Sequence, residues 1–234
     1  GGAFAAAPGW EDLFHFRRID QGNYYASKDN LYPDAKGNAR RINWGWARVP
    51  PASAQTLPRA VTFNAAARCL EQAPIEELKA LRGAVAFAAA DVRVGGAPRE
   101  IDLAPGVAAQ SEVVLRFGMP ASAGIFGLRL AGPEGELNCT VAYQPPPAGQ
   151  QELRWNITVG CGHFLDTLTL LRAEREIEVR VFVDNTFVEA YFQGGRVAMT
   201  AAAAWLSEST RMELVAASPV TLVRGDVYPM KSIL

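Results

Sequence analysis

Short β-prone runs separated by turn-forming residues fill most of this chain of 234 residues. In residues 176–181, EIEVRV, charged and aliphatic residues alternate strictly, which indicates a strand with one buried and one solvated face. Turn residues at Asp184-Asn185 and at Gly194-Gly195 extend this strand into a meander over residues 176–200. The pattern restricts the chain to an all-β architecture.

The remaining β-prone runs fall into two groups. The first is predicted at residues 14–19, 23–28, 41–48 and 60–64, and its four strands form an up-and-down sheet, the unit from which propeller blades are built. Such a sheet alone has open edges and an uncovered apolar face, so it requires neighbours. The second group is spaced as in an antiparallel sandwich, with strands at residues 113–119, 125–130, 137–143, 153–159, 176–200, 211–216 and 220–224.

Between the two groups, residues 74–83 (PIEELKALRG) predict one short helix. Pro74 suits the first helical turn, and Gly83 suits the left-handed position that follows the last turn. The aliphatic residues Ile75, Leu78 and Leu81 then fall on one face. We expect this helix to connect the two β units.

The charge balance argues against several classes of partner. The chain carries 23 basic and 24 acidic residues, so neither nucleic acid nor an anionic membrane is expected to bind it. No apolar run reaches the roughly 18 residues that a membrane span needs. With two histidines, and three cysteines that lack metal-ligand spacing, no metal site is predicted.

Two sequons place candidate N-glycosylation sites at Asn138 and Asn156. Cys139 and Cys161 are a candidate disulfide pair, and three buried free thiols are the alternative. The sequons and the cysteine pair favour a secreted, vacuolar or extracellular location.

Residue types alone identify no catalytic group. Asp184 and Glu189 lie in one predicted hairpin, where a solvated or turn-stabilising role is expected. Cys161 and His163 could share a strand face as a nucleophile and base, but the surrounding glycines favour a tight turn with a half-buried imidazole. We therefore predict no catalytic residue in this chain.

Residues 16–28 (FRRIDQGNYYASK) and 40–46 (RRINWGW) resemble the last propeller blade of glycoside hydrolase family 32, which contains invertases, inulinases, levanases and plant fructosyltransferases. Residues 55–61 (QTLPRAV) are similar to the family's Gln-(Ser/Thr)-(Leu/Ile)-Pro-Arg segment, and residues 74–82 to its inter-domain linker. Residues 182–192 (FVDNTFVEAYF) resemble its sandwich signature. The matches run in order from about residue 16 to residue 200.

The resemblance implies the last blade of a five-bladed β-propeller (residues 1–73), a linker helix (74–83) and a C-terminal antiparallel β-sandwich (84–234). The family's catalytic carboxylates lie in Asn-Asp-Pro, Arg-Asp-Pro and Glu-Cys motifs, and this sequence contains none of them. Together with an N-terminal propeller portion of the same protein, or a partner chain, the expected activity is hydrolysis or transfer at terminal β-fructofuranosides such as sucrose or fructans. The alternative is a non-catalytic carbohydrate-binding or structural subunit. No cofactor is implied.

Two residues match family positions at the sugar pocket. Asp20 matches a carboxylate that accepts hydrogen bonds from fructosyl hydroxyls, and its alternative role is structural, in the turn before Gly22. Trp46 matches an indole of the pocket wall, and its alternative role is to fill the core between blades, a place for which Trp44 is the stronger candidate. A fructose-containing saccharide is therefore the expected ligand.

Overall fold

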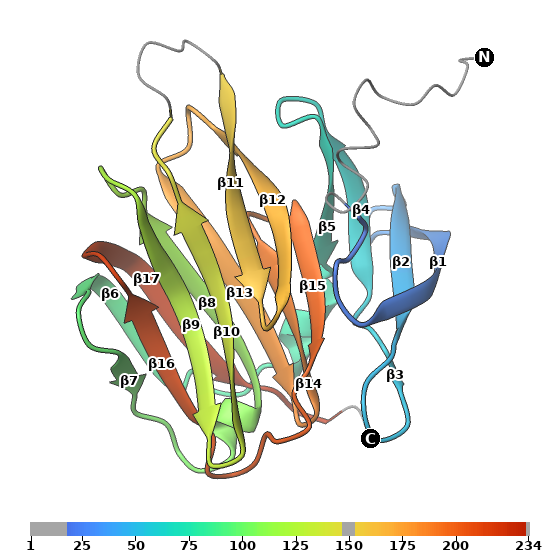
Figure 1. The fold of residues 1–234 in the computed structure, drawn as a ribbon. Helices are drawn as coiled ribbons and strands as arrows, with labels where there is room; N and C mark the ends of the chain where they lie inside the picture. The colour runs from blue at the N-terminus through green and yellow to red at the C-terminus, as the bar shows by residue number, and fades with distance from the viewer. Residues whose placement is uncertain (1–17, 147–152, 233–234) are drawn as a thin grey trace.

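The computed structural model describes residues 18–146 and 153–232, which form three antiparallel sheets (Figure 1). The N-terminal sheet has the order β1-β2-β4-β5, with β3 paired to β2. Its strands are β1 (Tyr24–Pro33), β2 (Ala39–Ala47), β3 (Ala54–Gln55), β4 (Arg59–Asn64) and β5 (Cys69–Pro74).

The other two sheets have six strands each and pack face to face as a β-sandwich. The outer sheet contains, in spatial order, β12 (Phe164–Leu171), β11 (Arg154–Cys161), β10 (Gly135–Tyr143), β9 (Gly124–Gly132), β16 (Arg211–Ala216) and β7 (Arg99–Ile101). The inner sheet contains β15 (Val197–Ala202), β14 (Phe187–Phe192), β13 (Glu176–Asp184), β8 (Gln110–Gly118), β17 (Val220–Pro229) and β6 (Phe87–Val94). The all-β prediction with a C-terminal sandwich is confirmed.

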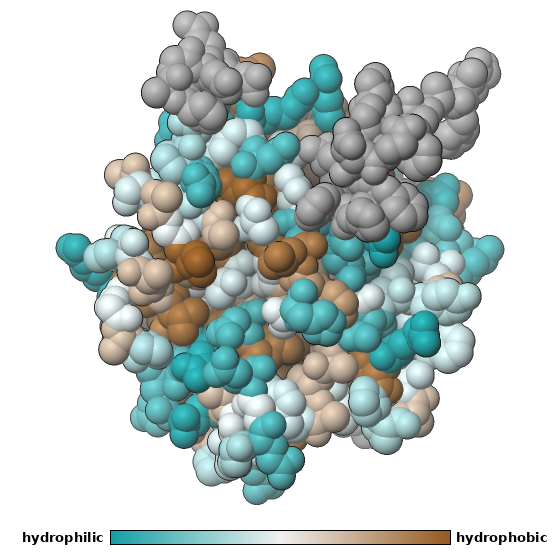
Figure 2. Space-filling model, viewed as in Figure 1, coloured by the Kyte–Doolittle hydropathy of each residue, from teal (hydrophilic) through white to brown (hydrophobic). Residues whose placement is uncertain are grey.

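The alternation of buried and more exposed residues along the strands shows where the sandwich core lies. In β13, Ile177, Val179 and Val181 are fully buried and join the cluster between the two sheets. On the face of the outer sheet that is turned to the viewer in Figure 2, apolar atoms are mixed with polar ones and form no single patch. This is the one-sided burial expected of antiparallel strands.

Strand β14 is the exception, because it is buried along its whole length. Val188, Ala190 and Phe192 face the sandwich core. Phe187 and Tyr191 face the opposite way, against residues of the N-terminal sheet and of the linker. The N-terminal sheet and the linker therefore cover the part of the inner sheet that would otherwise face water.

The linker helix is a 3-10 helix, η1 (Glu76–Leu81), and it is shorter than the predicted helix. Pro74 belongs to β5, and the helix ends at an extended Arg82, so the prediction of a left-handed glycine cap at Gly83 is wrong. A 3-10 helix has three residues per turn, so residues 75, 78 and 81 stack on one face. Leu78 is buried on that face.

Other differences from the predicted elements are local. The N-terminal sheet contains two strands that were not predicted, β3 and β5, while the predicted run at residues 14–19 lies mostly outside the described residues. The sequence reading missed β6, β7 and β12. The hairpin after β13 turns at residues 185–186, one position later than predicted, and Asn185 has the positive φ.

The N-terminal sheet contacts the sandwich through the backbone as well as through side chains. The Asn23 amide donates to the Thr200 carbonyl, and the Gln72 amide donates to the Gly195 carbonyl. Arg196 adds an ion pair to Glu71 of β5. A Cβ atom added at Gly22 would overlap the backbone of Thr200, so the close approach requires a glycine there.

Gly22→Ala should therefore push the N-terminal sheet away from β15 and destabilise the protein by about 1–3 kcal/mol, the usual range for overpacking. Denaturant unfolding measures the change. Gly118→Ala is the control, because its Cβ would lie 3.5 Å from the nearest side-chain atom, an ordinary contact. Equal stability of the two variants would contradict the close docking.

Candidate functional site

A fully buried arginine joins the N-terminal sheet to the sandwich. Arg59 begins β4, and its side chain is 0% exposed. Its Nη2 lies 2.9 Å from Asp20 Oδ2 and 2.7 Å from Glu189 Oε2. Its Nε donates to the Tyr191 hydroxyl at 3.0 Å, and Nη2 also donates to Thr200 Oγ1 at 3.1 Å. One guanidinium thus binds groups that are up to 180 residues apart from one another.

The surroundings of Arg59 keep it charged. Burial alone lowers the pKa of the guanidinium, but the Tyr191 hydroxyl and the carboxylates of Glu189 and Asp20 around it hold that pKa well above its usual value. Burial also raises the pKa of the Tyr191 hydroxyl well above its usual value. Tyr191 therefore stays protonated and donates to Glu189 Oε2 at 2.7 Å.

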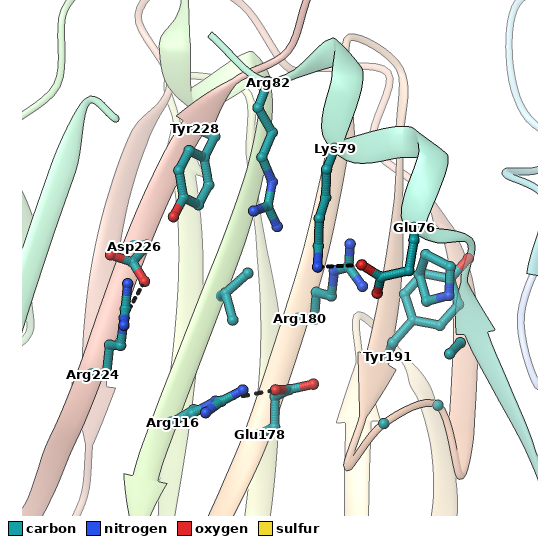
Figure 3. A pocket seen from close by; sticks show the side chains of 15 residues that line it. Glu76, Lys79, Arg82, Arg116, Glu178, Arg180, Tyr191, Arg224, Asp226 and Tyr228 are labelled. Carbon is teal, nitrogen blue, oxygen red and sulfur yellow. Dashed lines mark hydrogen bonds and ion pairs between the residues drawn. The ribbon is translucent and has the colours of Figure 1, made fainter. Parts of the chain in front are cut away.

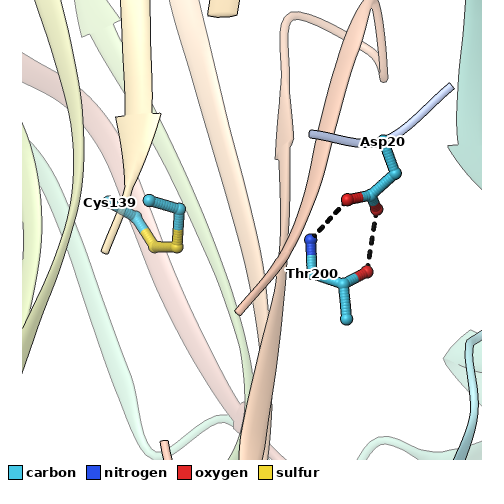
Figure 4. Close-up of a disulfide and its surroundings, with 4 residues drawn as sticks. Asp20, Cys139 and Thr200 are labelled. Atoms are coloured by element: carbon cyan, nitrogen blue, oxygen red, sulfur yellow. Dashed lines mark hydrogen bonds between the residues drawn. A yellow bond between two sulfur atoms is a disulfide. The ribbon is translucent and has the colours of Figure 1, made fainter. Parts of the chain in front are cut away.

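Asp20, expected at the sugar pocket, is directed into this cluster. One carboxylate oxygen accepts from the Gly22 amide at 2.7 Å and from the Thr200 amide at 2.9 Å, and Figure 4 shows the contact with Thr200. The other accepts from Arg59 and from Thr200 Oγ1. The side chain is 0% exposed, and four donors fill the four acceptor positions of a carboxylate. This geometry favours the structural role over the sugar-binding one.

Trp46, the other expected pocket residue, lies on the surface. It is on β2, opposite Tyr25 of β1, and the two rings pack edge to face with centroids 6.1 Å apart. Half of the Trp46 side chain is exposed, and it lines a groove of about 440 Å³ together with Lys28, Ser53 and Gln55. An indole there offers a flat apolar face and an N–H donor, both suited to a sugar ring.

The predicted modification sites lie in the outer sheet. Asn156 of β11 is exposed, although its amide oxygen accepts from the Thr169 hydroxyl, and Asn138 of β10 is half-buried. Cys139 and Cys161 are directly paired in the β10–β11 ladder and form a disulfide (Figure 4).

A second groove, of about 370 Å³, lies between η1 and the exposed face of the inner sheet (Figure 3). Many of the charged side chains that point into it are paired with one another, as in Arg116–Glu178 and Arg224–Asp226. Arg82 and Arg180, beside the groove, both bind the buried Glu112. Of these pairs, Arg82–Glu112 holds the end of the linker against the sandwich, and the others join residues of the inner sheet to one another.

Sequence reasoning missed Arg59, Glu189 and Tyr191. A solvated or turn-stabilising role was expected for Glu189, yet it is 1% exposed and binds Arg59 and the Leu57 amide. A signal was present, because Glu189 alternates with Phe187 and Tyr191 on one strand face. An acid between two aromatic residues indicates a buried carboxylate that requires a partner.

The described residues offer no free pair of acids at this cluster. Asp20 and Glu189 are the carboxylates brought together here, and both are bound to Arg59. Within residues 18–146 and 153–232, no group of three or more His, Cys, Asp or Glu side chains could hold a metal ion. In the same ranges, no helix is long and apolar enough to cross a membrane.

Removing the buried cation should be costly. Arg59→Leu leaves two buried carboxylates without their partner, so we expect a loss of about 3–5 kcal/mol in unfolding free energy. Arg41→Leu in the same sheet breaks an exposed pair with Asp29 and should change it by about 0–1 kcal/mol. Similar losses for the two variants would contradict the buried cluster.

Asp20→Asn separates the two roles considered for Asp20. A structural residue predicts a clear fall in melting temperature, because the amide cannot accept all four hydrogen bonds. Asp29→Asn is the exposed control. An unchanged melting temperature combined with weaker sugar binding would restore the pocket role.

Comparison with known proteins finds a matching family model and several similar proteins. The family model described as "Glycosyl hydrolases family 32 C terminal" matches residues 77–229. The chain is 29% identical over 245 residues to β-fructofuranosidase, insoluble isoenzyme 6, of Oryza sativa subsp. japonica, a match that covers 82% of this chain and 40% of that protein. It is 32% identical over 123 residues to a fructan 6-exohydrolase of Triticum aestivum, covering 47% of this chain and 19% of that protein.

Among solved structures, the chain is similar to a variant of fructan 1-exohydrolase IIa from Cichorium intybus in complex with 1-kestose. The TM-score is 0.77 at 18% sequence identity, and the match covers 92% of this chain and 49% of that chain. At this identity the likeness shows the fold. The chain spans less than half the length of these relatives.

Proposed function

The chain belongs to glycoside hydrolase family 32, and we propose that it is the C-terminal portion of a β-fructofuranosidase-like enzyme. Its N-terminal sheet is the last blade of the enzyme's propeller, and an N-terminal propeller portion, in the same protein or in a partner chain, supplies the catalytic carboxylates. The assembled enzyme hydrolyses, or transfers from, terminal β-fructofuranosides such as sucrose or fructans.

The observation that carries this proposal is the apolar surface of the N-terminal sheet. This short part of the chain holds seven of the eleven large apolar side chains exposed on the described residues: Ile19, Tyr25, Leu31, Tyr32, Trp46, Phe63 and Leu70. Exposed apolar area of this kind marks a surface that another element covers. The sandwich covers the face of the sheet that carries Arg59, whereas Tyr25, Tyr32 and Trp46 alternate onto the opposite face and are free to pack against further blades.

The exposed position of Trp46 supports a role for this chain at the sugar site. Its indole would form one wall of the pocket, and the groove lined by Lys28, Ser53 and Gln55 would border the bound fructoside. Hydrolysis with retention requires two carboxyl groups about 5–5.5 Å apart at the scissile bond, which the propeller portion provides. The disulfide of the outer sheet supports an oxidising, extracellular or vacuolar location.

Reconstitution tests the proposal. Residues 1–234 are produced alone, and together with a family 32 propeller portion that carries the Asn-Asp-Pro, Arg-Asp-Pro and Glu-Cys motifs. We expect the two parts to co-purify and to release fructose from sucrose, while neither part is active alone. In the active pair, Trp46→Ala should raise KM about tenfold or more, because an aromatic contact to the sugar is lost.

The control replaces the Asp of the Asn-Asp-Pro motif with Ala, which should abolish fructose release and leave co-purification intact. Co-purification without activity in the unmodified pair would instead favour a structural or carbohydrate-binding subunit. If this chain is a stable, monodisperse monomer that does not bind the propeller portion, the proposed assembly is refuted.

A further inference from the structure

Glu189 of the sandwich holds the Arg59 guanidinium from two directions. Its Oε2 lies 2.7 Å from Arg59 Nη2, and the same oxygen accepts from the Tyr191 hydroxyl, which in turn accepts from Arg59 Nε. The Glu189 side chain is 2% exposed, so these bonds are shielded from bulk solvent. A charged hydrogen bond in such surroundings is directional and strong.

Arg59, held by Glu189, in turn contacts Tyr24 of β1. Its guanidinium carbon lies 4.7 Å from the centre of the Tyr24 ring and 5.1 Å from the centre of the Tyr191 ring. The cation therefore lies between one aromatic ring of the N-terminal sheet and one of the sandwich. A desolvated cation over an aromatic face is attracted to it, so the place of Arg59 determines the place of the Tyr24 ring.

Tyr24 in turn supports the strand that carries Trp46. Its hydroxyl donates to the Asn43 side chain of β2. Its ring lies against the backbone of Gly45, where an added Cβ would overlap ring atoms. The Gly45 amide donates to Thr56 Oγ1 at 2.9 Å. The backbone just before Trp46 is thus held from the buried face, while the Trp46 side chain emerges on the opposite face.

We propose that Glu189 is a positioning residue for Trp46, which acts through Arg59 and Tyr24 across the boundary between the sandwich and the N-terminal sheet. The sandwich thereby sets the orientation of a sugar-contacting side chain that it does not touch. The contacts that lead from Glu189 through Arg59 and Tyr24 to β2 do not involve a sugar. Its consequence for catalysis rests on the proposed function.

The test measures amide hydrogen exchange by mass spectrometry on the full chain, in whichever assembly it purifies. The measured quantity is the ratio of the exchange rate in residues 42–47 to the exchange rate in residues 124–143 of the outer sheet. The second rate reports general destabilisation of the protein. We expect Glu189→Gln to raise this ratio about tenfold, because the local opening of β2 becomes easier. The additional variant Tyr24→Phe removes one hydroxyl only and should raise the same ratio.

Glu112→Gln is the matched control. Glu112 is equally buried in the inner sheet and binds two arginines, Arg82 and Arg180, but neither lies in the N-terminal sheet. It should lower the melting temperature and leave the ratio unchanged. Equal ratios for Glu189→Gln and Glu112→Gln, or no change with Tyr24→Phe, would overturn the proposal.

A second measurement separates this inference from the proposed function. In the reconstituted enzyme, Glu189→Gln should raise KM for sucrose several-fold with little change in kcat, and Glu112→Gln should change neither. A shifted exchange ratio without any fructose release from the unmodified assembly would leave the positioning path standing and refute the proposed function. A raised ratio with unchanged KM would show that β2 is supported by Glu189 but that Trp46 is not positioned by it.

Discussion

The buried cation of Arg59 is the interaction on which the arrangement of this protein depends. Its carboxylate partners come from both parts of the chain, Asp20 from the segment before β1 and Glu189 from the inner sheet of the sandwich. A buried charge without its partners is strongly destabilising, so neither part can satisfy the cluster alone. Apolar packing on the second face of β14 also requires both parts of the chain. Phe187 and Tyr191 are buried there against residues of the N-terminal sheet and the linker.

This docking gives the molecule two unlike surfaces around one sheet. On the side of the sandwich, the N-terminal sheet is fixed by charge, backbone contacts and aromatic packing. On its remaining surface it exposes apolar side chains, among them Trp46. Such a division agrees with the proposed arrangement, in which the sandwich supports the propeller and orients its last blade at the sugar site.

Much of the fold could be predicted because its signals are local. Alternation along residues 176–181 and the glycine pair at 194–195 predict strand, turn and buried face without reference to the rest of the chain. The family motifs also predicted the order of the blade, the linker and the sandwich along the chain. Strand β6 escaped prediction, since its run of alanines carries a weak β signal and gains its place from neighbours in the sheet.

The site itself could be predicted only in part. Residue pattern was sufficient for the all-β sandwich and for the family resemblance, because periodicity and motif order are properties of the sequence. Tertiary structure alone decided the direction in which each polar side chain points. A carboxylate before a glycine turn looks the same whether it faces a sugar or the amide of Thr200, 180 residues away. Burial and charge pairing are non-local, and they placed Asp20 inside the protein and left Trp46 at its surface.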